Sequence, residues 1–327
     1  MEIHLPSTDG PLGRLPAYQR NAPLTDEMVV RVGIPHSGGT LAFHAFKHGY
    51  AAMVSAQAFW QPKSGRFRFP SATNLSELDW ALDSAGYTAM KLWQAKGSQP
   101  GIASVFPWQY AQYVELACLS GATWWASPDM CCEESIASDQ QAVTYRVRAT
   151  ATLLEGVLRI VHGWQDELSK YCSAAVVRNM VRPCVPVLQG RRLSDYVESL
   201  ELTMAVWDRW RPWLASPTLI GLGSVCRRDL HHPDHGLYAI LEGLQPHLPP
   251  DVRVHLFGVK GAALEKVRHL PFVASVDSMA FDFRARVSAR ERVISNTMEN
   301  RTDEMTRWMQ AALQRVTGTS STQLALL

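Results

Sequence analysis

The sequence predicts an α/β fold: a (β/α)8 TIM barrel followed by a C-terminal helical extension. Eight short apolar or β-branched segments recur along the chain, each ending in a small, polar or acidic residue. Longer segments with apolar residues at three- and four-residue steps lie between most of them. Alternating strands and helices imply parallel pairing through right-handed crossovers, and eight units suggest a barrel. A doubly wound open sheet is the alternative, but no G-x-G-x-x-G follows the first strand.

The predicted elements follow one another without an obvious linker. The expected strands are Val29–Pro35, Ala51–Gln57, Trp80–Ser84, Ala122–Asp129, Cys184–Gly190, Leu219–Ser224, Val252–Gly258 and Phe272–Ser278. The expected helices are Tyr110–Leu119, Gln140–Lys170, Leu193–Trp210, Leu237–Leu244 and Ala262–His269, with one or two more in Ser288–Val316. No clear helix separates the second strand from the third. We therefore expect an N-terminal extension over 1–28, a catalytic barrel over 29–287, and C-terminal helices with a frayed tail over 288–327.

Composition excludes several classes of protein. The chain has 327 residues, 46% of them hydrophobic, and a net charge of only +2, which excludes disorder over most of its length. No apolar run approaches the ~18 residues of a membrane span, and the N-terminus lacks the layout of a signal peptide. A cytoplasmic location without membrane contact is the expectation. The six cysteines form no C-x-x-C and no Cys/His quartet, so neither a disulfide framework nor a bound metal is indicated.

Acidic and amide side chains stand at the carboxyl ends of the predicted strands, where a barrel places its catalytic residues. The relevant residues are Asp83, Ser84, Asp129, Gln189, Gly190, Gly221, Leu222, Phe257, Gly258 and Asp277. Three carboxylates and one amide would then face one pocket. Aspartate is a poor strand residue, so three in one ring of positions suggest a function. For any single aspartate, a helix N-cap or a loop residue is an equally good interpretation.

This set of side chains suits chemistry at an anomeric carbon. One carboxylate can attack and form a covalent sugar ester, while another moves protons on the departing or arriving group. An amide such as Gln189, with backbone N–H groups near glycine, suits recognition of a heterocycle edge. The residues alone indicate a barrel enzyme with an Asp-rich pocket, for which glycosyl transfer is one reading.

Six segments, in order, resemble motifs of the queuine and archaeosine tRNA-guanine transglycosylases. They are LDSAGYTAMKL (Leu82–Leu92), GATWWASPDMCCEE (Gly121–Glu134), PVLQG (Pro186–Gly190), LIGLGSV (Leu219–Val225), HLFGVKG (His255–Gly261) and ASVDSMAFDFR (Ala274–Arg284). Each lies at a predicted strand end. The spellings DSAG, SPDMCCE, GLGSVCRR and SVDS look closer to the DpdA-type 7-deazaguanine DNA transglycosylases of this superfamily.

The chain departs from the tRNA enzymes in informative ways. Those enzymes carry a C-terminal zinc site of three cysteines and a histidine, whereas this chain has no cysteine after Cys226. The zinc subdomain is therefore missing or rebuilt as helices. Arg191, Ile220 and the run Phe281–Phe283 replace other family motif residues. These departures favour DNA over RNA as the substrate.

The resemblance assigns a role to each strand-end residue. Asp277 would be the nucleophile that attacks C1′ of a guanosine nucleotide, and Asp83 would be the general acid and base. Asp129 would accept hydrogen bonds from the N–H edge of the purine, and Ser84 would orient the purine or the proton-transfer carboxylate. Gln189 and the backbone at Gly190, Gly221 and Leu222 would read the carbonyl side of the purine, while Phe257, beside Gly258, would stack beneath it. No cofactor is required, because one N-glycosidic bond is exchanged for another.

The implied substrates are guanine-containing DNA and a free 7-deazaguanine base such as preQ0. A flipped nucleotide and a basic rim are expected, with Lys260, Arg227, Arg228, Arg284 and Arg286 as the nucleic-acid-binding candidates. The segment Lys63–Phe69 interleaves basic and aromatic residues, and it is either a further nucleic-acid contact or a solvated hairpin. Alternatives are a tRNA-guanine transglycosylase and a non-catalytic nucleic-acid-binding subunit. A homodimer is allowed, since transglycosylases of this family often dimerise.

Overall fold

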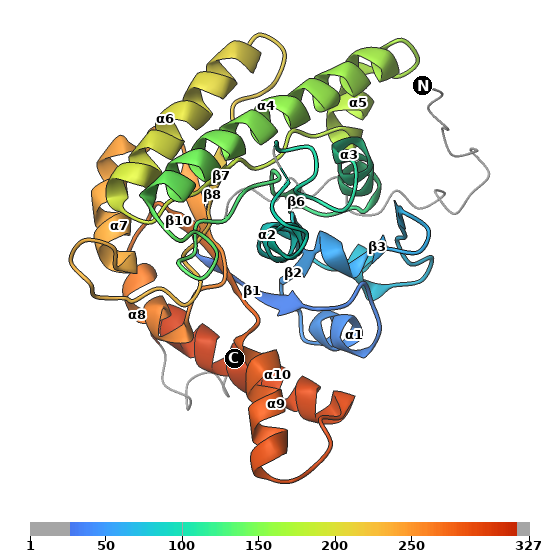
Figure 1. Cartoon of the computed structure of the whole chain (residues 1–327). Coiled ribbons are helices and arrows are strands. Elements are labelled where there is room, and N and C mark those ends of the chain that lie inside the picture. Colours follow the sequence, from blue (N-terminus) through green and yellow to red (C-terminus); the bar gives the residue numbers. More distant parts are fainter. Residues whose placement is uncertain (1–26, 100, 319–327) are drawn as a thin grey trace.

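Eight parallel strands form one curled sheet at the centre of the computed structural model, which describes residues 27–99 and 101–318 (Figure 1). The strands are β1 (Val29–Ile34), β2 (Ala52–Ser55), β5 (Trp80–Asp83), β6 (Trp124–Trp125), β7 (Val187–Leu188), β8 (Leu219–Leu222), β9 (Arg253–Leu256) and β10 (Val273–Ser278). Their spatial order is β6-β5-β2-β1-β10-β9-β8-β7. All eight predicted strands are confirmed, and the fold is α/β and TIM-barrel-like.

The outermost strands of this order, β6 and β7, are also linked to each other. An isolated parallel bridge joins Ala126 to Val185. Across it, Val185 N donates to Trp125 O and Ser127 N donates to Val185 O, each at 2.8 Å. The sheet therefore curls far enough to bring its first and last strands side by side.

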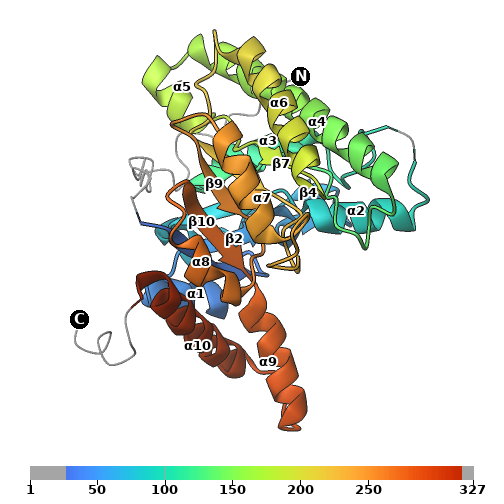
Figure 2. The same cartoon turned by 90° about the vertical axis from the view of Figure 1, so that its left-hand side faces the viewer.

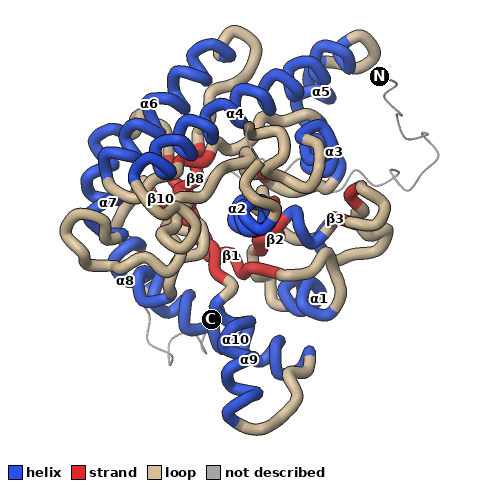
Figure 3. The backbone as a smooth tube through the Cα atoms, viewed as in Figure 1, coloured by secondary structure: helices blue, strands red, loops and turns tan. Residues whose placement is uncertain are grey.

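Ten α-helices lie outside or beyond the sheet in the described part of the chain (Figure 3). They are α1 (Thr40–Lys47), α2 (Gly86–Ala95), α3 (Tyr110–Leu119), α4 (Gln140–Ser169), α5 (Ala174–Met180), α6 (Leu193–Trp210), α7 (Leu237–Leu244), α8 (Leu264–Val267), α9 (Ala280–Glu291) and α10 (Met298–Thr317). Helices α3, α6 and α7 match their predictions to the residue, and α4 ends one residue early. Helices α1, α2 and α5 were not predicted.

The connection from β2 to β5 contains no α-helix, as expected. It carries instead a short antiparallel hairpin of β3 (Trp60–Gln61) and β4 (Arg66–Phe67). The aromatic rings of the hairpin pack inward: Phe67 lies 4.9 Å from Trp108, and Phe69 stacks on Phe59 at 5.3 Å between centroids. The structure thus makes Lys63–Phe69 part of a hairpin whose phenylalanines are used in packing.

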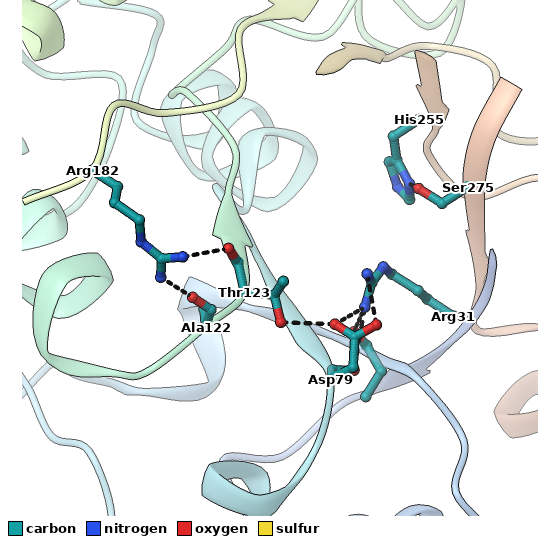
Figure 4. A network of polar contacts seen from close by, with 8 residues as sticks. Arg31, Asp79, Ala122, Thr123, Arg182, His255 and Ser275 are labelled. Atoms are coloured by element: carbon teal, nitrogen blue, oxygen red, sulfur yellow. Dashed lines mark hydrogen bonds and ion pairs between the residues drawn. The ribbon is translucent and has the colours of Figure 1, made fainter. Parts of the chain in front are cut away.

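Side chains alternate between the two faces of each strand, which is what positions the polar groups. In β1, Val30, Val32 and Ile34 belong to the main hydrophobic core, while Arg31 points to the inner face. Arg31 is 4% exposed and forms two hydrogen bonds to the carboxylate of Asp79, at 3.0 and 3.1 Å. Asp79 in turn accepts from Thr123 Oγ1 at 2.7 Å (Figure 4). The inner face of the curled sheet is therefore filled partly by ionic contacts.

Helices α9 and α10 extend beyond the rest of the fold (Figure 2). Helix α10 packs against α9, α1 and α8. The predicted domain boundary at residue 287 falls within α9. Most of the predicted extension over 1–28, and the tail from residue 319, lie outside the described residues. Among the helices that the structure describes, none is long and apolar enough to cross a lipid bilayer.

Candidate active site

Three aspartates from three strands come together at the carboxyl ends of the sheet. Asp83 is the last residue of β5, Asp129 follows β6, and Asp277 lies near the end of β10. They are close enough to sense one another: burial, followed by the charges of Asp129 and Asp277, raises the pKa of Asp83 to about 7. The structure thus brings together the three carboxylates that were expected to share a site.

Asp83 is held by the turn that leads into α2. Its Oδ2 accepts a hydrogen bond from Ala85 N at 3.0 Å, and Ala85 itself has a left-handed backbone (φ 65°). Gly86, the first residue of α2, passes so close to Asp129 that a Cβ atom there would lie 2.7 Å from Asp129 Oδ1. A glycine is therefore needed for the β5–α2 turn to sit against the second carboxylate.

Asp129 is buried and accepts hydrogen bonds from three side chains. Ser84 Oγ donates to Oδ1 at 2.6 Å, while Gln189 Nε2 and Cys131 Sγ donate to Oδ2. Burial nevertheless raises the pKa of Asp129. The donors keep the carboxylate in one orientation, with Ser84 on one side and Gln189 on the other.

The polar chain continues beyond Gln189, whose side chain is completely buried. Its Oε1 accepts from Ser224 Oγ at 2.5 Å, and that hydroxyl also lies 3.3 Å from Glu133 Oε2. Cys132 N donates to Ser224 Oγ at 2.6 Å. Residues that follow β5, β6, β7 and β8 are thus joined in one hydrogen-bond chain around the carboxyl end of the sheet.

The side chain of Asp277 has a separate set of contacts, all made through one carboxylate oxygen. Its Oδ1 accepts from Gly258 N at 2.9 Å and lies 3.3 Å from His255 Nε2. His255 is completely buried, its Nδ1 lies 2.7 Å from Ser275 Oγ, and burial lowers its pKa. Within the described residues Oδ2 forms no hydrogen bond. One oxygen of Asp277 is therefore held by the protein, and the other has no hydrogen-bond partner among the described residues.

Glycines at the strand ends allow close packing around these groups. A Cβ atom at Gly221 would lie 2.4 Å from Phe257 Cε2, and one at Gly190 would lie 2.9 Å from Asp195 Cβ. Gly258, which holds Asp277, has a left-handed φ of 70°. Phe257 lies edge-on to His255, with 4.6 Å between ring centroids. These contacts place the predicted aromatic residue beside the carboxylate cluster.

A comparison with protein-family models identifies the chain. The model described as DpdA, DeoxyPurine in DNA protein A, matches residues 63–316. The chain belongs to the DpdA family. No curated protein matches the chain. The matched region contains all three aspartates and begins after β2. Membership suggests a transglycosylase enzyme that modifies DNA with 7-deazaguanines, and it confirms the predicted relationship.

The five basic residues predicted for the rim of this DpdA-family site differ in their surroundings. Lys260 and Arg227 are exposed, and the side chains of Arg284 and Arg286 are 73% and 63% exposed. Arg228 is half-buried, and its guanidinium donates to the carbonyls of Gly190, Arg191, Ser224 and His235. The Arg228 side chain therefore links the loop after β7 to the loop after β8 through hydrogen bonds.

Leu222 has a buried side chain, and its backbone is hydrogen-bonded to the next strand. Its side chain belongs to the main hydrophobic core, and its carbonyl accepts from Phe257 N at 3.2 Å. This placement is compatible with the expected role of the Gly221–Leu222 backbone.

Several polar residues of the DpdA-family site were not singled out from the sequence. His255, Ser275, Ser224 and Glu133 all lie within the quoted motifs but received no role. A signal existed for His255, since it stands between Val254 and Leu256, which pack outward in the main core, and so must point to the inner face. No such signal marked Ser224. Among the described residues, no group of three His, Cys, Asp or Glu side chains could hold a metal ion.

Proposed function

We propose that this DpdA-family chain exchanges guanine in DNA for a free 7-deazaguanine base of the preQ0 type, through a covalent bond between Asp277 and C1′. The observation that carries the proposal is the geometry of Asp277, whose Oδ1 is held by Gly258 N while Oδ2 has no partner in the described chain. A nucleophile needs one oriented oxygen that is not engaged elsewhere.

In the first half of the reaction, Asp277 Oδ2 attacks C1′ as the bond from C1′ to N9 of guanine breaks. The leaving purine takes a proton from Asp83. A carboxyl group with a pKa of about 7 is suited to this step, because it is still substantially protonated near neutral pH. The products are free guanine, an ionised Asp83 and a sugar ester on Asp277.

In the second half, the incoming 7-deazaguanine gives its N9 proton to Asp83. The nitrogen attacks C1′, and the ester bond to Asp277 breaks. Asp83 regains its proton and Asp277 its charge, so the enzyme returns to its starting state. One glycosidic bond replaces another, and the exchange needs no cofactor.

The hydrogen-bond chain around Asp129 supports recognition of a purine. Asp129 offers acceptor oxygens for the N–H edge of the base, with Ser84 and Gln189 beside it. Gly190, Gly221 and the Leu222 backbone would lie along its carbonyl side. Phe257, packed against Gly221, would support the ring from below.

Basic residues around the site support a nucleic-acid substrate. Lys260, Arg227, Arg284 and Arg286 would contact phosphates, whereas the bonds of Arg228 to four carbonyls favour an internal role. We further infer that the Ala126–Val185 bridge closes a complete barrel and that α9 and α10 replace the zinc subdomain of the tRNA enzymes.

The test is incorporation of radiolabelled guanine and of labelled preQ0 into double-stranded DNA and, in parallel, into unmodified tRNA. We expect transfer to DNA, an SDS-resistant protein–DNA adduct when the incoming base is withheld, and neither with Asp277→Ala. Transfer to tRNA alone would establish the RNA alternative. Binding of DNA without any transfer or adduct would favour a non-catalytic subunit.

A further inference from the structure

Helix α9 carries an apolar ridge on its exposed face. Met279, Phe283 and Val287 are 43%, 64% and 36% exposed, and their four-residue spacing places them on one side of the helix. The ridge begins two residues after Asp277. Figures 1 and 2 both show α9 extending away from the sheet. Most of the Phe283 ring is thus open to solvent and available to a partner.

The opposite face of α9 is firmly attached to the protein. Phe281 and Ala285 are completely buried. Asp282 pairs with Arg301 at 2.6 Å, both side chains being 11% exposed, and Asn300 Nδ2 donates to Ala285 O at 3.0 Å. These contacts with α10 fix the orientation of α9, so the ridge is presented on a rigid support.

Arginines border the ridge. Arg284, Arg286, Arg290 and Arg292 are all exposed along or just after α9, and the acidic residues near them are Asp282, Glu291 and Glu304. Arg284 and Arg292 lie 3.7 and 3.9 Å from the carboxylate of Glu304, and Arg286 lies 3.6 Å from that of Asp282. Because Arg301 and Arg307 pair with the same two carboxylates, arginines outnumber acidic residues here. Asp282 is neutralised by Arg301, and the Arg286 guanidinium lies 5.9 Å from the centre of the Phe283 ring. A row of apolar side chains between positive charges matches stacked bases between phosphates.

We infer that this ridge is a wedge that enters duplex DNA beside the target nucleotide, with Phe283 occupying the space that the extruded guanosine leaves in the base stack. The inference rests on the proposed function and deepens it. An enzyme that acts on C1′ of a paired nucleotide must take that nucleotide out of the stack, and apolar side chains inserted between base steps stabilise the opened duplex. The ridge is directly continuous with the strand that carries the nucleophile.

The wedge is tested by comparing duplex and single-stranded substrates of identical sequence. Phe283→Ala should lower the rate of labelled-guanine exchange into plasmid duplex about tenfold, which corresponds to the loss of one stacking contact between an aromatic ring and a base. The rate of exchange into the heat-denatured strands should change by no more than about twofold. Phe283→Trp should retain duplex exchange. Leu119→Ala is the matched control, since Leu119 is 53% exposed on α3, on the other side of the molecule from α9 in Figures 1 and 2. An equal loss on both substrates, or none on the duplex, overturns the wedge.

A second measurement does not depend on chemistry. Permanganate oxidises thymines that have lost their stacking, so plasmid duplex bound to the wild-type protein should show reactive thymines that are absent with Phe283→Ala and present with Leu119→Ala. If the wild-type protein exchanges no base but the thymines react as expected, the wedge is supported and the proposed function is wrong. If the wild-type protein creates no reactive thymines, the wedge is wrong. Conversion of a wild-type dimer to a monomer by Phe283→Ala in sedimentation would also overturn it, in favour of an interface between two copies.

Discussion

His255 Nε2 lies 3.3 Å from Asp277 Oδ1, and the other ring nitrogen of the same histidine lies 2.7 Å from Ser275 Oγ. An ionised carboxylate only accepts hydrogen bonds, which makes Nε2 the donor and leaves Nδ1 to accept from the serine hydroxyl. Burial lowers the pKa of His255, which agrees with a neutral ring. The carboxylate of Asp277 therefore sets the tautomer of His255, the serine hydroxyl accommodates it, and the Nε2–H group holds Asp277 Oδ1.

His255→Phe should lower kcat for base exchange about tenfold with little change in KM for DNA, since the ring keeps its shape but no longer orients Asp277. His255→Gln, which retains a donor, should recover part of kcat. The rate of adduct formation in a single turnover is the measurement. A purely structural role would instead lower the melting temperature of both variants and leave the kcat of the folded protein unchanged.

The pH dependence of the first half-reaction should report Asp83. Because Asp83 must carry a proton when guanine leaves, kcat/KM for DNA should be constant below pH 7 and fall about tenfold per pH unit above it. The charge of Asp129 contributes to this raised pKa, so Asp129→Asn should move the break in the profile to lower pH. A break that stays in place, or moves upward, would contradict the assignment.

Asp83 should also lower the free energy of unfolding at high pH. Its pKa is about 7 in the folded protein against 3.8 in the unfolded chain, so the folded state binds more protons between these values and stability falls as pH rises through them. Asp83→Asn removes this cost. In urea unfolding, the variant should gain about 1 to 3 kcal/mol over the wild type at pH 8, after discounting for partial exposure, and less at pH 5. The reverse order would exclude a raised pKa.

Arg227 and Arg228 are adjacent and identical in type, yet they should behave differently. Arg228→Ala removes donors from four carbonyls and should destabilise the protein by about 2 to 4 kcal/mol in urea unfolding. Arg227→Ala should leave stability within about 0.5 kcal/mol but weaken DNA binding and reduce its salt slope by about one. The opposite pairing of effects would place Arg228, and not Arg227, at the phosphates.

The sheet was predictable because each strand has a local signature. Val30, Val32 and Ile34 alternate with inward residues, and the aspartates at strand ends follow from the same pattern, so the meeting of Asp83, Asp129 and Asp277 could be expected. Helix α2 escaped prediction because it begins at a glycine after a left-handed alanine, which in sequence is typical of a loop. The series of hydrogen bonds that links Ser84 to Ser224 was not predicted, because its residues are distant in sequence and joined only by tertiary contacts.

The two-residue strands β6 and β7 are joined by one bridge, whereas β1 and β10 share a register of four residue pairs. Backbone amides at Ser127 and Val185 are then expected to exchange with solvent earlier than those of β1, because few contacts oppose local opening there. Directly beyond these strands, the side chains of Asp129 and Gln189 are hydrogen-bonded across the same gap. A base that binds to Asp129 beside Gln189 would oppose separation of the two strands and so slow amide exchange at Ser127 and Val185, which makes amide exchange at these two residues a measure of site occupancy.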